Sequence, residues 1–188
     1  MADLAAARLN MVESQVRTSD VTDVRLHDVM RVLPREQFVP EGKTYLAYAD
    51  LEVEYAPGRF LMRPRDVAKL LQALRPMPGE RALAIAAPYA AAVIEQLGVT
   101  VDRVDGEDLR AVSGQYDCII SEGAVAQAPQ EWLSALAPNG RLVVVERDGP
   151  VGKAGLYLRT EDGVGRRDLF DAPTPVLKGF EAQHGFAF

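Results

Sequence analysis

The sequence has 188 residues, 48% of them apolar and 26% charged, a balance typical of one compact globular domain. Its formal net charge of −6, without any Lys/Arg run, argues against binding to nucleic acid or anionic lipid. A single cysteine, two widely separated histidines and the lack of a long apolar run predict a cytoplasmic protein without disulfide, metal or membrane contact.

Apolar residues at helical spacing predict two helices at the N-terminus. The second is expected to begin after Thr22 as its cap and to end before Pro34. The chain from 34 to 64 is a long, proline-marked connection, and loops of that length are commonly functional or cover a ligand. The stripe of the first helix consists of Ala5, Leu9, Val12 and Val16, and that of the second of Leu26, Val29 or Met30, and Leu33.

A third helix is predicted from Pro64, a proline suited to a first helical turn. Strand and helix then alternate, which predicts a mostly parallel, doubly wound α/β sheet with an antiparallel end. We expect one domain over 1–188, with a helical segment at 1–75 and the sheet region at 79–188. The expected strands are 81–86, 99–104, 116–120 and 141–146, the helices 88–97 and 129–136, and the terminal hairpin 155–170.

Several stretches of the chain resemble the protein-L-isoaspartate O-methyltransferase family. They are "MVESQVR" at 11–17, "VTDVRLHDVMRVLPREQFVPE" at 21–41, "YLAYAD" at 45–50, "YDCIISEGAV" at 116–125 and "LAPNGRLVVVE" at 136–146. The resemblance implies a Rossmann-like, seven-stranded methyltransferase fold. It also implies S-adenosylmethionine as methyl donor and isoaspartyl carboxylates in damaged proteins as acceptors.

The turn after the first strand departs from this family. Active relatives carry E/D-x-G-x-G-x-G there, whereas this chain reads "LAIAAPYAAAVI", with about two residues deleted. Alanine disfavours φ > 0 and caps helices poorly, and proline lacks an N–H. Losing two charge-assisted contacts costs about 3–6 kcal/mol, or roughly two to four orders of magnitude in affinity. The cofactor-binding positions expected to be vestigial are Ala84, Ala86, Ala87, Pro88 and Tyr89, together with Asp105 and Glu122.

The stretch between the second and third of these strands is too short for the family pattern. Only 106–115 separate "VTVDRVD" from "YDCII", and a crossover between parallel strands usually needs a dozen residues or more. One helix–strand unit is therefore predicted to be shortened or missing. Asp105 then matches the family's ribose-binding acid, or Asp108 matches its adenine-side residue. A plain turn at Asp105-Gly106 is the interpretation we favour.

The acceptor side differs as well. Where the family carries a T-I-S-Q-P-like stretch, "RFLMRP" places Phe60 at the threonine and Met62 at the serine. Arg63 or Arg59 offers a cation for a substrate carboxylate, although arginines beside a loop are usually solvated. We assign no catalytic residue.

Four further side chains have two interpretations each. Glu122 follows a strand at the carboxyl edge, where α/β sheets hold ligands, but a solvated loop tip is the usual alternative. Cys118 is expected to be a buried, inert thiol and His27 a surface residue. Trp132 either anchors a partner interface or covers the sheet.

Together these departures predict a non-catalytic pseudo-methyltransferase that needs no cofactor. It would act through its surface, as a homodimer or with a protein partner. One alternative is an active, S-adenosylmethionine-dependent isoaspartyl methyltransferase with an atypical site, since positioning dominates methyl transfer. The other is a module that binds a different small molecule in a remodelled, more apolar cleft.

Overall fold

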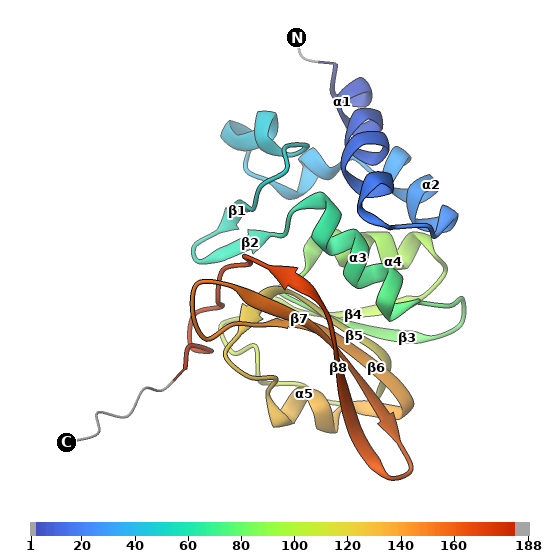
Figure 1. The fold of residues 1–188 in the computed structure, drawn as a ribbon, viewed down its shortest axis with the longest axis vertical. Coiled ribbons are helices and arrows are strands. Elements are labelled where there is room, and N and C mark those ends of the chain that lie inside the picture. The colour runs from blue at the N-terminus through green and yellow to red at the C-terminus, as the bar shows by residue number, and fades with distance from the viewer. Residues whose placement is uncertain (1–2, 183–188) are drawn as a thin grey trace, which may run out of the picture.

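The computed structural model describes residues 3–182 and places a layer of N-terminal helices over a six-stranded sheet (Figure 1). The strand order is β4-β3-β5-β6-β7-β8, parallel from β4 to β6 and antiparallel beyond. This confirms the predicted Rossmann-like α/β class with its antiparallel terminal hairpin. The strands are β3 Arg81–Ile85, β4 Thr100–Val104, β5 Tyr116–Val125, β6 Leu136–Glu146, β7 Gly152–Thr160 and β8 Gly163–Ala172.

The first helix changes its winding. Helix α1 (Leu4–Met11) continues as a π-helical turn (Val12–Val16) and a 3₁₀ turn (Arg17–Ser19). Met11, Val12 and Val16 are buried, but Ala5 and Leu9 are exposed, so the first half of the predicted stripe is wrong. A constant 3.6-residue period does not carry through a π turn, and the buried face is therefore displaced.

Helix α2 (Val24–Val32) ends before Pro34 as predicted. Its cap is Asp23 rather than Thr22, because the Asp23 side chain accepts a hydrogen bond from the Arg25 N–H at 3.0 Å. The expectation that His27 lies on the surface is wrong. Its side chain is buried, with Nε2 2.8 Å from the main-chain oxygen of Val21 in the turn before the helix.

The long connection from 34 to 64 is structured. It holds two 3₁₀ turns, Arg35–Phe38 and Glu41–Leu46, and a separate two-stranded hairpin of β1 (Val53–Ala56) and β2 (Arg59–Leu61). Helix α3 (Pro64–Leu74) follows and begins at Pro64 as predicted. The hairpin was not predicted, because its strands are only four and three residues long.

The two faces of the sheet are covered unequally. Helices α3 and α4 (Pro88–Gln96) pack on one face beneath the N-terminal layer, and α5 (Gln130–Ser134) lies on the other (Figure 1). Trp132 of α5 is fully buried and donates its Nε1–H to the Leu109 carbonyl, so it covers the sheet. Cys118 is buried as expected, and burial raises the pKa of its thiol.

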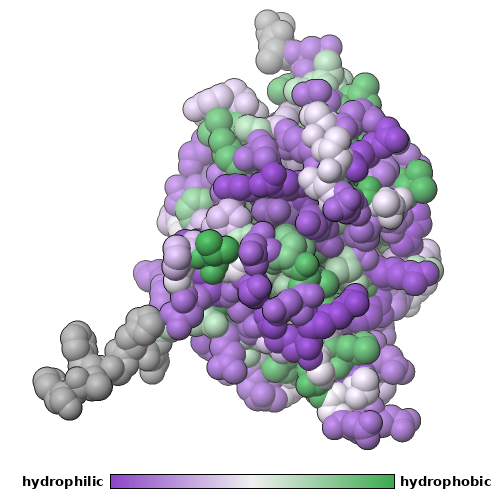
Figure 2. Space-filling model, viewed as in Figure 1, coloured by the Kyte–Doolittle hydropathy of each residue, from purple (hydrophilic) through white to green (hydrophobic). Residues whose placement is uncertain are grey.

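No helix or strand forms between β4 and β5. This confirms the missing helix–strand unit, and it leaves β4 as an edge strand of six rather than one of seven. No helix within residues 3–182 is long and apolar enough to cross a membrane. The face of the molecule shown in Figure 2 is mainly hydrophilic, with apolar residues in small groups.

Candidate functional site

The chain reverses its order in the sheet at β3, which has β4 on one side and β5 on the other. In open α/β sheets, ligands bind outside the carboxyl ends of the strands at such a point. The turn between β3 and α4 lies there and contains the alanines predicted to replace glycines. Ala86 adopts a left-handed φ of 46° and donates its N–H to the Val104 carbonyl at 3.0 Å. The backbone therefore keeps a glycine-like conformation, although an alanine occupies it.

The N-terminus of α4 has no cap from its own segment. Ala87 stands at the cap position with φ −134° and no side-chain hydrogen bond, and Pro88 opens the helix without an N–H. Ala84, Ala86 and Ala87 are each 1% exposed, and Tyr89 is fully buried. Apart from Pro88, which is partly exposed, the side chains of the turn are therefore enclosed by protein atoms.

Glu122 of β5 supplies the missing cap. Its Oε1 accepts a hydrogen bond from the Ala90 N–H at 2.7 Å, and its Oε2 accepts one from the Met62 N–H at 3.2 Å. The side chain is 0% exposed, so the solvated alternative is wrong: β5 runs on to Val125 and holds Glu122 inside. An internal carboxylate thus occupies a helix N-terminus, the kind of place where an anionic ligand group is held.

A second buried charge balances this carboxylate. Arg35 is fully buried, donates to the main-chain oxygens of Ala47 and Met62, and lies with its guanidinium carbon 4.6 Å from the centre of the Tyr89 ring. Burial raises the pKa of Glu122, while Arg35 and the main-chain N–H donors oppose the shift. Burial likewise lowers the pKa of Arg35, and Tyr89 and Glu122 oppose that shift. Each charge therefore favours ionisation of the other.

The substrate-side candidates are bound to the chain itself. The Met62 side chain is fully buried. Its main-chain N–H donates to Glu122, and its carbonyl accepts from Arg35. Arg63 forms an ion pair with Glu52 at 3.0 Å and has 26% of its side chain exposed. Arg59 donates to the main-chain oxygens of 105 and 106, which ties the β1–β2 hairpin to the loop after β4.

Both candidate nucleoside anchors are exposed and lie in the stretch that follows β4. Asp105 directly follows β4 at the carboxyl edge, where desolvation raises the pKa of its carboxyl and the nearby Arg59 and Arg103 oppose that shift. Asp108 is exposed, and its Oδ1 accepts from the Arg110 N–H at 2.9 Å. The chain bends at 106–107, and Arg59 holds this bend by donating to the main-chain oxygens of 105 and 106.

Sequence reasoning missed the role of the C-terminal segment. The N–H of Ala124 donates to Pro175, and the N–H of Leu177 donates to Ala124, so the segment lies along the end of β5. Leu177 is 2% exposed and packs against Gly123, where an added Cβ would come within 2.3 Å of it. Glycine inside an apolar strand often marks such a close approach, and that was the available signal.

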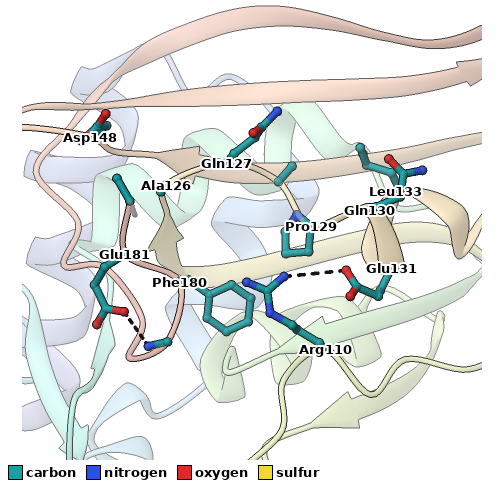
Figure 3. Close-up of a pocket in the computed structure, with 13 residues that line it drawn as sticks. Arg110, Ala126, Gln127, Pro129, Gln130, Glu131, Leu133, Asp148, Phe180 and Glu181 are labelled. Carbon is teal, nitrogen blue, oxygen red and sulfur yellow. Dashed lines mark hydrogen bonds and ion pairs between the residues drawn. The ribbon is translucent and has the colours of Figure 1, made fainter. Parts of the chain in front are cut away.

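Two cavities lie near this edge. One of about 640 Å³ is formed by the chain after β5, by α5 and by the C-terminal segment (Figure 3). Within it Arg110 lies over the ring of Phe180 and 3.7 Å from Glu131, and none of the predicted site residues lines it. The other, of about 500 Å³, lies between the hairpin and the C-terminal segment and is lined by Arg59, Glu107 and Lys178.

Comparison with known proteins identifies relatives along nearly the whole chain, although no family model matches it. The protein-L-isoaspartate O-methyltransferase of Methylorubrum extorquens is 32% identical, covering 94% of this chain and 91% of the relative. The enzyme of that name from Methylorubrum populi is 30% identical, with 94% and 98% covered.

Solved structures agree on the fold. A putative protein-L-isoaspartate O-methyltransferase from Plasmodium falciparum, in complex with S-adenosyl-L-homocysteine, superposes with a TM-score of 0.75 at 17% identity. That match covers 95% of this chain and 99% of the other. A second protein-L-isoaspartate O-methyltransferase gives a TM-score of 0.73 at 18% identity, covering 92% of this chain and 66% of the other. The chain therefore belongs to the protein-L-isoaspartate O-methyltransferase family.

Proposed function

We propose that this chain is a non-catalytic member of its family, a pseudo-methyltransferase that acts in the cytoplasm by binding another protein. The observation that carries the proposal is the Glu122 carboxylate, which accepts the Ala90 N–H at the start of α4. A ligand carboxylate would need the same donor. Two carboxylates that share one N–H donor repel each other, so the Glu122 carboxylate excludes a ligand carboxylate from this position.

Two further contacts support the proposal. Leu177 packs against Gly123 at the end of β5, and the Arg59 guanidinium holds the loop after β4 against the hairpin. Together with Glu122 they occupy the helix N-terminus and the ends of the strands on both sides of it. Met62 is buried where the family pattern carries a hydroxyl group, so no hydroxyl stands at that position to orient a substrate carboxylate.

The alternative is an active, S-adenosylmethionine-dependent isoaspartyl methyltransferase with an atypical site. Two observations favour this alternative. The chain belongs to the family, and Ala86 keeps the left-handed, glycine-like conformation of the turn. This alternative requires the Glu122 carboxylate to leave the Ala90 N–H when the cofactor enters. A buried side chain that is hydrogen-bonded at both oxygens resists such a movement.

A methyl-transfer assay tests the proposal. The purified chain is incubated with radiolabelled S-adenosylmethionine and a peptide containing isoaspartate, beside an active family member and beside the same peptide with normal aspartate. We expect no transfer above that of a sample without protein. Transfer that depends on isoaspartate would establish the alternative.

A further inference from the structure

Asn139 and Gly140 lie in a bend where β6 leaves the ladder of the sheet. Strand β6 pairs with β5 at Leu136 and next at Arg141, whose partners in β5 are only two residues apart. Within the described sheet, the bend at 137–140 therefore has no partner in β5 or in β7. We propose that Asn139-Gly140 is a deamidation site, at which the chain forms aspartyl and isoaspartyl residues. The inference goes beyond the proposed function and does not depend on it.

The conformation of the bend exposes the Asn139 side chain. Asn139 has a left-handed φ of 62° and follows Pro138, which fits a type II turn with proline and asparagine at its two central positions. Its side chain is exposed, and in residues 3–182 it makes no hydrogen bond. The Asn139 amide can therefore rotate toward the main chain that follows it.

Gly140 is the residue that makes this amide reactive. It is buried, and a Cβ added to it would lie 2.7 Å from the Ala137 oxygen and 2.8 Å from the Tyr116 oxygen, so only glycine fits. A glycine has no side chain to shield its main-chain nitrogen from the preceding Asn139 side chain. The packing of the bend therefore fixes, directly after an exposed asparagine, the residue that least hinders ring closure.

Deamidation at this pair needs only water. The Gly140 main-chain nitrogen loses its proton to solvent and attacks Cγ of Asn139. A bond forms between these two atoms, the Cγ–Nδ2 bond breaks, and Nδ2 takes up a proton and leaves as ammonia. Water then opens the cyclic imide: cleavage at Cγ gives an aspartyl residue, and cleavage at the main-chain carbonyl carbon gives an isoaspartyl residue. Each product is heavier by about 1 Da and carries an added negative charge.

The isoaspartyl product carries a free carboxylate on the former main-chain carbonyl carbon of Asn139. An isoaspartyl residue is the acceptor for which the relatives of this chain are named. The aged chain would therefore be a methyl acceptor for an active member of its own family, whether or not it transfers methyl groups itself.

Asn10 is the only other asparagine in the sequence and provides an internal control. It lies in α1 and precedes Met11, whose main-chain nitrogen is held in the helix and carries a bulky neighbouring side chain. Three Asp-Gly pairs, at 105–106, 148–149 and 162–163, can close the same imide by losing water. Their products regain the original mass when water opens the imide, so a gain of mass identifies deamidation alone.

Ageing of the intact chain tests the inference. The purified protein and its Asn139→Gly variant are incubated at physiological pH and temperature, and a third sample of the unchanged protein is incubated unfolded in guanidinium chloride. Peptide mass mapping follows the mass at both asparagines. An active protein-L-isoaspartate O-methyltransferase with radiolabelled S-adenosylmethionine then counts isoaspartyl carboxylates. Asn139→Gly keeps the φ of 62° without strain and removes the amide, and thermal unfolding verifies that the variant folds.

We expect the folded chain to gain mass at Asn139 at least about ten times faster than at Asn10, because the helix holds Asn10 closed. The aged Asn139→Gly variant should accept fewer methyl groups than the unchanged chain. A folded chain that keeps its mass at Asn139 overturns the inference, and the unfolded sample then shows whether the fold protects the bend. Equal rates at the two asparagines, or equal methyl acceptance by the two proteins, also overturn it. The mass is measured without any methyl donor, so the inference and the proposed function fail separately.

Discussion

The Oε1 of Glu122 lies 2.7 Å from the main-chain nitrogen of Ala90, with both groups fully buried. This contact joins the end of β5 to the start of α4, the two elements on either side of the reversal point in the sheet. Since the carboxylate satisfies a helix N-terminus that has no cap of its own, it contributes to stability. Under the proposed function, the same carboxylate also takes the place of an anionic ligand group at this helix N-terminus.

The buried charges Arg35 and Glu122 should depend on each other. We expect Glu122→Leu and Arg35→Met each to lower the free energy of unfolding by about 3–5 kcal/mol, because each leaves one charge buried without its counterpart. The double variant should lose at least about 1 kcal/mol less than the sum of the two. Urea unfolding of the four proteins measures this coupling, and strictly additive losses would show that the two side chains act independently.

Ala86 should be strained by its left-handed backbone. Replacing it with glycine relieves the Cβ clash at φ 46°, and we expect Ala86→Gly to raise the free energy of unfolding by about 0.5–1 kcal/mol. The matched control is Ala87→Gly, at φ −134°, where added freedom in the unfolded chain should destabilise instead. Thermal unfolding compares the two, and a loss of stability in both would contradict the assigned turn geometry.

The contact between Gly123 and Leu177 should tolerate no added methyl group. A Cβ at Gly123 would lie 2.3 Å from the Leu177 side chain, so Gly123→Ala should destabilise the chain by about 1–3 kcal/mol. Adding Leu177→Ala should recover part of that loss by making room. Gly165→Ala in β8 is the control, because nothing lies within 4 Å of its added Cβ. If Gly123→Ala changes the free energy of unfolding no more than Gly165→Ala does, the C-terminal segment does not lie against β5.

Asp66 in the first turn of α3 should make stability depend on pH. Burial raises its pKa to about 6, above the value of an unfolded aspartate, so its charge destabilises the fold. The stability present when Asp66 is protonated is then lost as pH rises from about 4 through about 6. We expect Asp66→Asn to gain about 1–2 kcal/mol at pH 7.5 and almost nothing at pH 4, by chemical denaturation. Asp28→Asn, at an exposed site, should differ little between these pH values; an equal gain in both variants would contradict the assignment.

Much of the architecture could be predicted because it depends on local patterns. The change from helical segments to alternating short strands and helices marks the start of the sheet, and the short 106–115 stretch cannot hold a crossover helix. The end of α2 before Pro34 and the start of α3 at Pro64 likewise follow from the backbone chemistry of proline. The π-helical turn Val12–Val16 could not be predicted, because no local sequence pattern marks it.

The site was harder to predict, because its contacts join segments far apart in the chain. The sequence pattern places Glu122 of "YDCIISEGAV" at the end of a strand. Its role as a buried cap follows only from the position of α4, whose Ala90 N–H it accepts. Leu177 likewise lies more than fifty residues from Gly123, against which it packs. The replacement of glycines at this turn was visible in the sequence, because alanine and proline disfavour φ > 0, although Ala86 nevertheless adopts φ 46°.

Titration with S-adenosyl-L-homocysteine by isothermal calorimetry tests the central claim most directly, that the chain's own carboxylate occupies the ligand position. We predict no saturable heat at ligand concentrations up to about 1 mM, since two charge-assisted contacts are unavailable. A dissociation constant in the micromolar range, with one site per chain, would contradict the account.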